Sequence, residues 1–231
     1  PSLPYLSFLC INFDAPVIKE AASWFLDGVF LNYNSSYLEQ MLEQLLDEDD
    51  SLEITRFLRA VDVRIDGFRV EKAPEWRGQR VFVKHEVDGK GYELRLSEES
   101  AGTQKLMGLA SFLLAALERG GTVVVDELDA KLHPKLLRYV ILLFKDPEVN
   151  KSGAQLIFSS QDVSTMRNDV FRRDEIWFAA RGEWEASQLW SLADIHEANG
   201  NLVSKNAAFD KQYLSGRYGA DPYLTRIEEW D

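Results

Sequence analysis

Apolar side chains recur at helical spacing in the early part of the chain. Residues 17–30 and 35–47 place them three and four positions apart, which is typical of amphipathic helices. The acidic run DEDDS ends the second stretch, and a further short helix is expected over residues 52–60. The pattern therefore predicts a helical region over residues 1–60, which we interpret as a packing module, either an insert or a lid.

The pattern changes to apolar–polar alternation between residues 61 and 96. The runs VDVRIDGFRVEK, QRVFVKHEVDG and GYELRLSEE are separated by glycine and proline turns, and they predict β-strands. The stretch VDGKGYE contains a Gly-Lys pair, but it lacks the spacing Gly-x4-Gly-Lys-Ser/Thr of a phosphate-binding loop. A hairpin turn is therefore expected at this pair.

From residue 100 onward, predicted strands alternate with predicted helices. TVVV is a β-branched run without polar alternation, as in a strand that is buried on both faces. The expected elements are a helix over 100–119 that stops at Gly120 and Gly121, a strand over 122–127, a helix over 131–146 with Pro134 in its first turn, a strand over 154–162 and a strand hairpin over 174–194. This alternation predicts a parallel α/β layer whose functional edge lies at the carboxyl ends of its strands.

Composition and charge narrow the class of protein. The 231 residues are 45% hydrophobic, which is a globular value, and 38 acidic residues against 26 basic ones give a net charge of −12. Such a surface repels a phosphate backbone, so DNA is not supported as a partner by charge. The single cysteine, Cys10, excludes an internal disulfide and fits a reducing cytosol. The apolar run at 106–118 is too short to span a membrane, and we expect a cytoplasmic protein without a membrane segment.

Two adjacent acids, Asp126 and Glu127, follow the TVVV strand directly. Alternation along a strand would set the two carboxylates on opposite sides of its tip. One carboxylate can bind a hydrated magnesium ion, and its neighbour can polarise a water for attack on a terminal phosphate. A strand-end aspartate that only caps the next helix is the alternative.

Small polar residues begin the helix that precedes this strand. In ESAGTQKL, Ser100, Gly102 and Thr103 lie where free backbone N–H groups and the helix dipole favour an anion. An ordinary capped helix start explains the same residues. A second strand ends in IFSSQD, where Gln161 and Asp162 either approach a nucleotide or cap a helix.

The order and spacing of these stretches resemble the C-terminal half of an ABC-type ATPase head. ESAGTQKL resembles the signature motif, TVVVDE the Walker B strand and LDAKLHP the D-loop, while FSSQD stands at the switch-histidine loop. The chain is most similar to the branch that includes SMC, RecF and OLD-like proteins, and within it to AAA-family ATPases of bacterial antiphage defence and abortive infection. The resemblance covers roughly residues 60–224, including the tail YLSGRYGADPYL.

This resemblance implies an α/β fold of the P-loop NTPase type, with a parallel-sheet ATPase head that lacks its N-terminal lobe. Residues 61–231 would form the C-terminal lobe, and ATP and Mg²⁺ would be its ligands. Asp126 would hold the metal and Glu127 would be the general base. Gln161 replaces the switch histidine, and its amide can hydrogen-bond a phosphate but cannot carry a proton, which favours slow hydrolysis or a nucleotide-gated clamp. His133, in LHP, is expected to have a structural role at a helix start.

The resemblance also implies a second copy of the head as a partner. Ser100, Gly102 and Thr103 would contact the γ-phosphate of a nucleotide bound by the opposing subunit. Lys105 belongs to the same nucleotide-binding stretch, and Asp129 would lie at the dimer seam. An effector, such as a nuclease, is the further partner that the resemblance suggests.

The phosphate-binding loop of such ATPases is absent, because Gly-x4-Gly-Lys-Ser/Thr occurs nowhere in the sequence. The chain opens on Pro1 without a methionine, and we expect an N-terminal lobe with this loop to precede it. The chain by itself would then be inactive and bind ATP weakly. Two alternatives are a non-hydrolytic scaffold that binds a partner effector and a metal nuclease; the dense acids DEDD at 47–50 lie in a polar loop and do not favour the nuclease.

Overall fold

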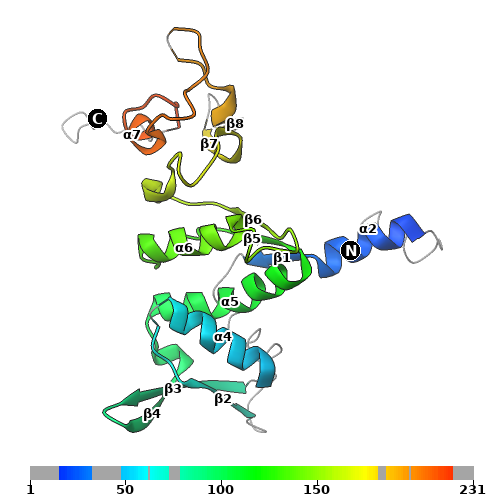
Figure 1. Cartoon of the computed structure of the whole chain (residues 1–231), viewed down its shortest axis with the longest axis vertical. Helices are drawn as coiled ribbons and strands as arrows, with labels where there is room; N and C mark the ends of the chain where they lie inside the picture. Colours follow the sequence, from blue (N-terminus) through cyan, green and yellow to red (C-terminus); the bar gives the residue numbers. More distant parts are fainter. Residues whose placement is uncertain are drawn as a thin grey trace. The chain divides into compact units, whose positions relative to one another are not determined.

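The computed structural model describes residues 16–32, 48–61, 63–72, 79–181, 186–197 and 199–220. The chain divides into two compact units, Pro1–Gln161 and Asp162–Asp231, which Figure 1 shows in blue to green and in yellow to red. The residues expected to hold the metal, act in catalysis or bind nucleotide fall in the first unit, whereas Asp162 begins the second unit, where its side chain caps a 3-10 turn. The predicted domain boundary after residue 60 stays a prediction.

A parallel sheet lies at the centre of the first unit. Its strand order is β1 (Val29–Asn32), β5 (Thr122–Val125) and β6 (Gln155–Phe158), and both neighbouring pairs are parallel. β5 is the middle strand, and Val123 and Val125 on it are buried, as the unbroken β-branched run predicts. The predicted mixed α/β fold with a parallel sheet is therefore confirmed.

Two helices flank β5 in the chain and pack on this sheet. α5 (Ala101–Arg119) packs against β1 and β5, and α6 (Pro134–Lys145) packs against β6. Gly120 ends α5 in the left-handed conformation (φ 82°), which a residue without Cβ adopts at no steric cost. Both helices agree with the sequence pattern to within a few residues at each end.

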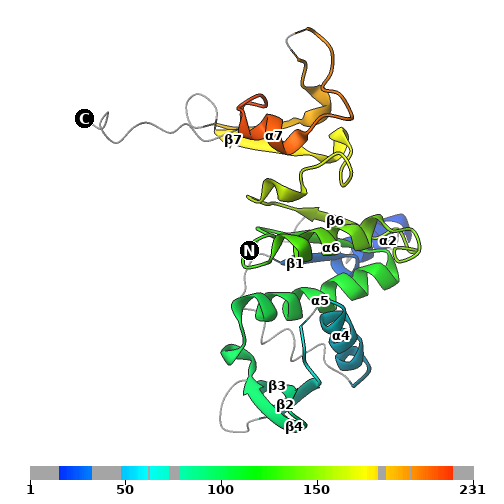
Figure 2. The ribbon, with the colours of Figure 1, turned by 60° about the vertical axis from the view of Figure 1, so that its left-hand side comes forward.

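The early part of the chain differs from the expected run of helices. α2 (Pro16–Asp27) ends before Gly28, and the next four residues form β1, although the pattern placed residues 17–30 in one helix. The expected helix over residues 35–47 lies outside the described residues. The one expected over 52–60 is α4 (Glu48–Ala60), which packs against α5 (Figures 1 and 2). The acids at 48–50 form the first turn of this helix, so the expectation that they lie in a loop was wrong.

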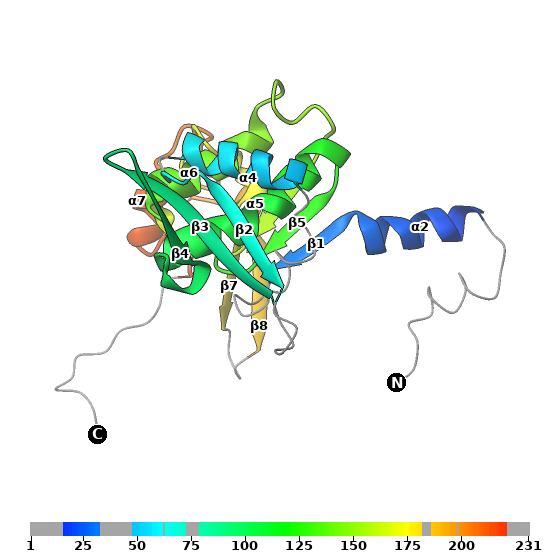
Figure 3. The ribbon, with the colours of Figure 1, turned by 90° about the horizontal axis from the view of Figure 1, so that it is seen from below.

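An antiparallel sheet follows α4. β2 (Gly67–Lys72), β3 (Gln79–Val87) and β4 (Lys90–Arg95) pair in that order, and Figure 3 shows the three strands side by side. Asp88 and Gly89 connect β3 to β4 with φ values of 53° and 72°, which is the left-handed pair that a two-residue hairpin requires. The Gly-Lys stretch is thus a hairpin turn, as predicted. The short 3-10 helix η2 (Leu96–Glu98) leads into α5.

The second unit is built around a strand hairpin. β7 (Trp177–Arg181) and β8 (Ser187–Ser191) pair antiparallel, as predicted, and α7 (Phe209–Leu214) follows them in the chain. The helix start expected after β6 is the 3-10 helix η3 (Val163–Thr165), and two more single turns are η4 (Arg173–Glu175) and η6 (Leu192–Asp194). The core of the unit consists of Ile176, Phe178, Leu192, Val203, Phe209 and Tyr218.

Among the described helices, none has the length and apolar character needed to cross a lipid bilayer.

Candidate functional site

The two adjacent acids lie in a turn and not on the strand itself. β5 ends at Val125, and residues 126–131 form a run of turns that carries both carboxylates into solvent. Strand alternation therefore does not set the directions of Asp126 and Glu127, contrary to the expectation from the sequence. Glu127 has φ 50°, a left-handed conformation that is uncommon for a residue with a side chain. We call residues 126–131 the acid turn.

Ser159, at the end of β6, contacts both acids. Its hydroxyl donates to Asp126 Oδ1 over 2.5 Å, and the same Oγ accepts the backbone N–H of Glu127 over 2.7 Å. Sequence reasoning missed this residue, and its only signal was the pair of small polar residues in IFSSQD.

Lys105 comes from the first turns of α5 and reaches the acid turn from the other side. Its ammonium donates to the backbone carbonyl of Glu127. Burial lowers the pKa of Lys105, while the nearby carboxylates of Asp129 and Glu127 act in the opposite direction. In this structure Lys105 supports the turn that holds the acids; its predicted contact with a nucleotide stays a prediction.

The start of α5 is capped by its own side chains. Ser100 Oγ accepts the backbone N–H of Thr103 over 3.1 Å, and the hydroxyls of Ser100 and Thr103 are 2.8 Å apart. These contacts fit the capped helix start that the sequence left open as an alternative. Both hydroxyls remain exposed or partly exposed at the positive end of the helix dipole, where an anion is favoured.

Gly102 brings the helix start against the acid turn. A Cβ at this position would lie 2.8 Å from the carbonyl oxygen of Lys131, closer than real Cβ atoms approach an oxygen. Lys131 is itself left-handed, with φ 64°. The stretches ESAGTQKL and DELDAK, which resemble the signature motif and the Walker B and D-loop residues, therefore touch within one chain.

Asp129 connects the acid turn to the end of β6. Its Oδ2 accepts the backbone N–H of Gln161 over 3.2 Å. Its buried Oδ1 has no hydrogen-bond partner within the described part of the chain. The structure thus brings Gln161, at the switch position, next to the aspartate of the D-loop-like stretch.

The histidines have structural contacts elsewhere. His133 caps α6, because its Nδ1 accepts the backbone N–H of Lys135 over 3.1 Å, and this confirms the expected helix-start role. His85 Nε2 lies 2.6 Å from Glu99 Oε1.

Asp126 fits a magnesium ion that is held mainly by phosphate. Magnesium takes one or two protein carboxylates and completes its shell with water and phosphate oxygens, and Asp126 is an exposed carboxylate at the end of a strand. Over the residues that the structure describes, no three His, Cys, Asp or Glu side chains converge as a metal site.

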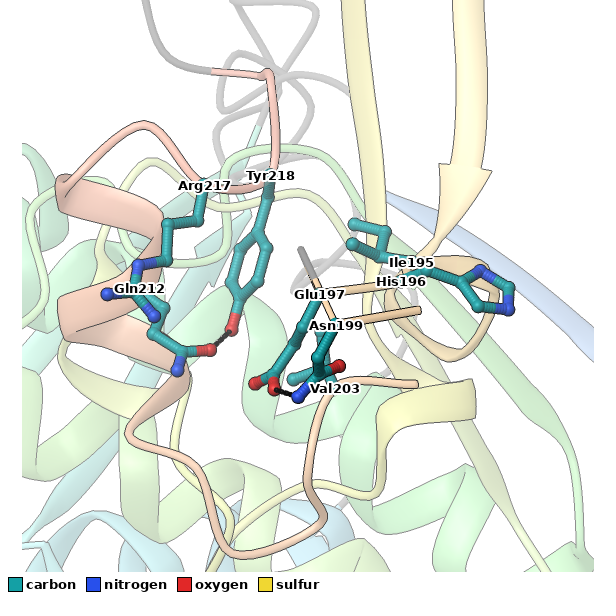
Figure 4. Close-up of a pocket in the computed structure, with 8 residues that line it drawn as sticks. All are labelled: Ile195, His196, Glu197, Asn199, Val203, Gln212, Arg217 and Tyr218. Atoms are coloured by element: carbon teal, nitrogen blue, oxygen red, sulfur yellow. Dashed lines mark hydrogen bonds between the residues drawn. The ribbon is translucent and has the colours of Figure 1, made fainter. Parts of the chain in front are cut away.

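A separate cavity lies in the second unit and contains none of the expected site residues. It has a volume of about 460 Å³ and is lined by Ile195, His196, Glu197, Asn199, Val203, Gln212, Arg217 and Tyr218. Figure 4 shows Gln212, Arg217 and Tyr218 facing Glu197 and Asn199 across it. Tyr218 donates its hydroxyl to Gln212 Oε1 over 2.7 Å, and burial raises the pKa of Tyr218 to about 12. This cavity is well apart in sequence from the acid turn.

Comparison with known proteins gives a matching family and a set of similar solved structures, two of which are described below. The family described as "AAA domain, putative AbiEii toxin, Type IV TA system" matches residues 9–167. One similar structure comes from work on ATP-driven dimerisation and DNA-stimulated activation of SMC ATPases; it is 16% identical, with 67% of this chain and 88% of that chain covered and a TM-score of 0.44. Another is an SMC head bound to the C-winged helix domain of ScpA. It is 16% identical, with 66% of this chain and 43% of that chain covered and a TM-score of 0.39. No curated protein matches the chain.

Proposed function

The chain belongs to this AAA domain family, and from that membership we propose that it forms the part of an ABC-type ATPase head that carries the general base, the metal carboxylate and a phosphate-binding helix start. In this proposal ATP is bound and hydrolysed between two copies of the head, and hydrolysis controls an effector of antiphage defence. The family's description connects it to an abortive-infection toxin, which fits that biological role.

The observation that carries the proposal is the backbone of Glu127. A residue with a side chain at φ 50° is strained, and such strain persists where its surroundings hold it and concentrates at active sites. Here Ser159 accepts the N–H of Glu127 and Lys105 donates to its carbonyl, so the strained residue is held from both sides. The residue held in this way is the one that the resemblance to ABC-type ATPase heads assigns as the general base.

The chemistry of the acid turn follows from the two carboxylates. Asp126 would hold Mg²⁺, which when bound neutralises charge on the phosphate oxygens. The Glu127 carboxylate would accept a proton from a water molecule as the water oxygen attacks the γ-phosphorus. The bond from the γ-phosphorus to the bridging oxygen breaks, and ADP and inorganic phosphate are released. The helix start of α5 would place backbone N–H groups and the hydroxyls of Ser100 and Thr103 against the phosphate of the opposing subunit.

The proposal requires a phosphate loop supplied by other sequence, because the motif Gly-x4-Gly-Lys-Ser/Thr does not occur in these 231 residues. β6 is an edge of the parallel sheet within the described residues, and Ile157 on it is 56% exposed. An open edge with apolar side chains is suited to another strand. We place the lobe with the phosphate loop along β6.

The alternative is a scaffold that keeps the ATPase fold without hydrolysis, and Gln161 at the switch position favours it. An amide cannot take up or release a proton near neutral pH. The intact pair Asp126 and Glu127 opposes this alternative, because a scaffold does not need a general base.

Replacement of Glu127 by glutamine in the full-length protein separates the two functions. We expect Glu127→Gln to lower the rate of ATP hydrolysis by about 10²–10⁴-fold, the usual contribution of a general base, while ATP binding is retained. Glu118→Gln is the matched control, because Glu118 is an exposed glutamate in the last turn of α5. If Glu127→Gln hydrolyses ATP as fast as the Glu118→Gln control, the hydrolytic function is wrong and the scaffold is favoured.

A further inference from the structure

We propose that Ser159 is the positioning residue of this site, and that its single hydroxyl orients both acids of the acid turn at once. The inference rests on the proposed function, because it assigns the residue that makes Asp126 and Glu127 competent together. Ser159 belongs to neither the acid turn nor the start of α5, and it reaches the acids from the end of β6.

Ser159 is joined to the β5 end and the acid turn through all of its polar groups. Its N–H donates to the carbonyl of Val125 over 3.1 Å, which extends the β5–β6 pairing by one step beyond the strands. Its carbonyl accepts the N–H of Leu128 over 3.0 Å, and Leu128 is fully buried. The backbone of Ser159 is therefore fixed on both sides, and its hydroxyl is held at one place beside Asp126 and Glu127.

The directions of the two hydroxyl contacts are determined by chemistry. An ionised carboxylate only accepts and a backbone N–H only donates, so the serine proton points to Asp126 and an oxygen lone pair receives the N–H of Glu127. The hydroxyl uses its one donor and one of its acceptor positions without conflict.

Each contact has a separate consequence. The bond to Asp126 fixes the rotation of the carboxylate, in the way that outer hydrogen bonds orient metal ligands. The Ser159 hydroxyl accepts the N–H of the left-handed residue Glu127, which without it would bond to solvent. Lys105 holds the carbonyl of Glu127 on the other side. Without the hydroxyl the turn can relax toward a less strained backbone, and the Glu127 side chain then leaves its position.

Only another hydroxyl can replace both contacts. Alanine at position 159 removes the donor and the acceptor, whereas threonine keeps both. Ser152→Ala is the matched control, because Ser152 is also an exposed serine of the first unit, and its Oγ donates to the carbonyl of Glu118 over 2.8 Å, away from the acids.

The first test is ATP turnover by the full-length protein over a range of Mg²⁺ concentrations. We expect Ser159→Ala to lower kcat about 10–100-fold and to raise the Mg²⁺ concentration for half-maximal rate, with a much smaller change in KM for ATP. Ser159→Thr should restore most of kcat, and Ser152→Ala should match the wild type. The inference is overturned if Ser159→Ala turns over ATP like the wild type, or if Ser159→Thr is as impaired as Ser159→Ala.

The second test does not need hydrolysis and separates this inference from the proposed function. Hydrogen exchange of the Glu127 amide is measured by NMR in the same proteins without nucleotide. The Glu127 amide should exchange slowly in the wild type and in Ser159→Thr and much faster in Ser159→Ala, while the Leu128 amide, bonded to the Ser159 carbonyl, changes little. Equal exchange of the Glu127 amide in all three would refute the positioning role. A wild type that exchanges as expected but never hydrolyses ATP would refute the proposed function alone.

Discussion

Replacement of Gly102 by alanine tests the contact between the start of α5 and the acid turn. The added Cβ would lie 2.8 Å from the carbonyl oxygen of Lys131 and 3.9 Å from Ser100 Oγ. The first contact is with backbone, so no side-chain rotation relieves it. Either the first turn of α5 or the loop at Lys131 has to move.

The size of the effect follows from that overlap. Moving packed backbone by a few tenths of an ångström to admit one methyl group costs about 1–3 kcal/mol. Removal of a glycine also reduces the freedom of the unfolded chain, which offsets about 0.4–1 kcal/mol. Taking the middle of each range, we expect Gly102→Ala to lower the free energy of unfolding by about 1.3 kcal/mol.

The assay is denaturant unfolding of the chain without nucleotide, with Gly91→Ala as the control. Gly91, on β4, has no atom within 4 Å of an added Cβ and no positive φ, so its replacement should change stability by less than about 0.5 kcal/mol. The outcome that refutes the reasoning is a Gly102→Ala protein as stable as Gly91→Ala. In that case the glycine would serve only the approach of a phosphate, and its contact with Lys131 would not matter for folding.

Two further predictions concern other parts of the structure. The side chain of Asn150 joins α6 to the residue before β6 through hydrogen bonds of 2.8, 2.8 and 2.7 Å to the backbone of Phe144 and Ala154. Asn150→Ala should therefore lower the free energy of unfolding by about 2–3 kcal/mol, at roughly 1 kcal/mol per bond. Denaturant midpoints test this against Asn206→Ala, a change at an exposed asparagine, and equal midpoints would contradict it. Tyr218 has its pKa raised from 10.0 to about 12, so the folded state keeps a proton that the unfolded state loses. The stability that this provides is complete below pH 10 and is lost as the pH rises toward about 12, and Tyr218→Phe should remove that part of the pH dependence; an unchanged pH profile would show that the buried phenol is not its source.

Elements that depend on neighbouring residues were predictable from the sequence. The hairpin at Asp88 and Gly89, the stop of α5 at Gly120 and the cap of α6 at His133 each follow from local backbone chemistry. The parallel pairing of β5 with β6 followed from the alternation of strands and helices. In the hairpin, the helix stop and the helix cap, the residues that decide the structure are close together in the chain. The β5–β6 pairing joins distant residues, and it was predictable because strand-helix-strand units give parallel neighbours.

Features that depend on distant residues were not predictable. β1 has only four residues, too few to show a strand pattern, and its pairing with Thr122–Val125 depends on a partner far along the chain. The contact of Gly102 with Lys131 is a tertiary contact, and so is the double hydrogen bond of Ser159. The sequence could therefore name Asp126 and Glu127 as the acids, but it could not name the residue that holds them.

The pairing of Asp129 with the backbone of Gln161 bears on how the switch position works. Because the contact is made by the N–H of Gln161, the loop is positioned in the same way whichever side chain it carries. A glutamine there changes the chemistry available to the phosphate without changing the attachment of the loop to Asp129. For this reason we expect the site to form but to hydrolyse ATP slowly.

The central claim is that the acid turn of one copy and the helix start of another form one ATPase site, and a mixing experiment tests it most directly. Glu127→Gln removes the base. Ser100→Asp keeps a helix-capping side chain but places a negative charge next to the phosphate, which repels it. Each full-length variant alone should hydrolyse little ATP. In an equal mixture half of the dimers contain one of each, and one of their two sites has both intact parts, so about a quarter of the wild-type rate should return. If the mixture is no faster than the separate variants, the two halves do not meet between subunits and the account of the site is wrong.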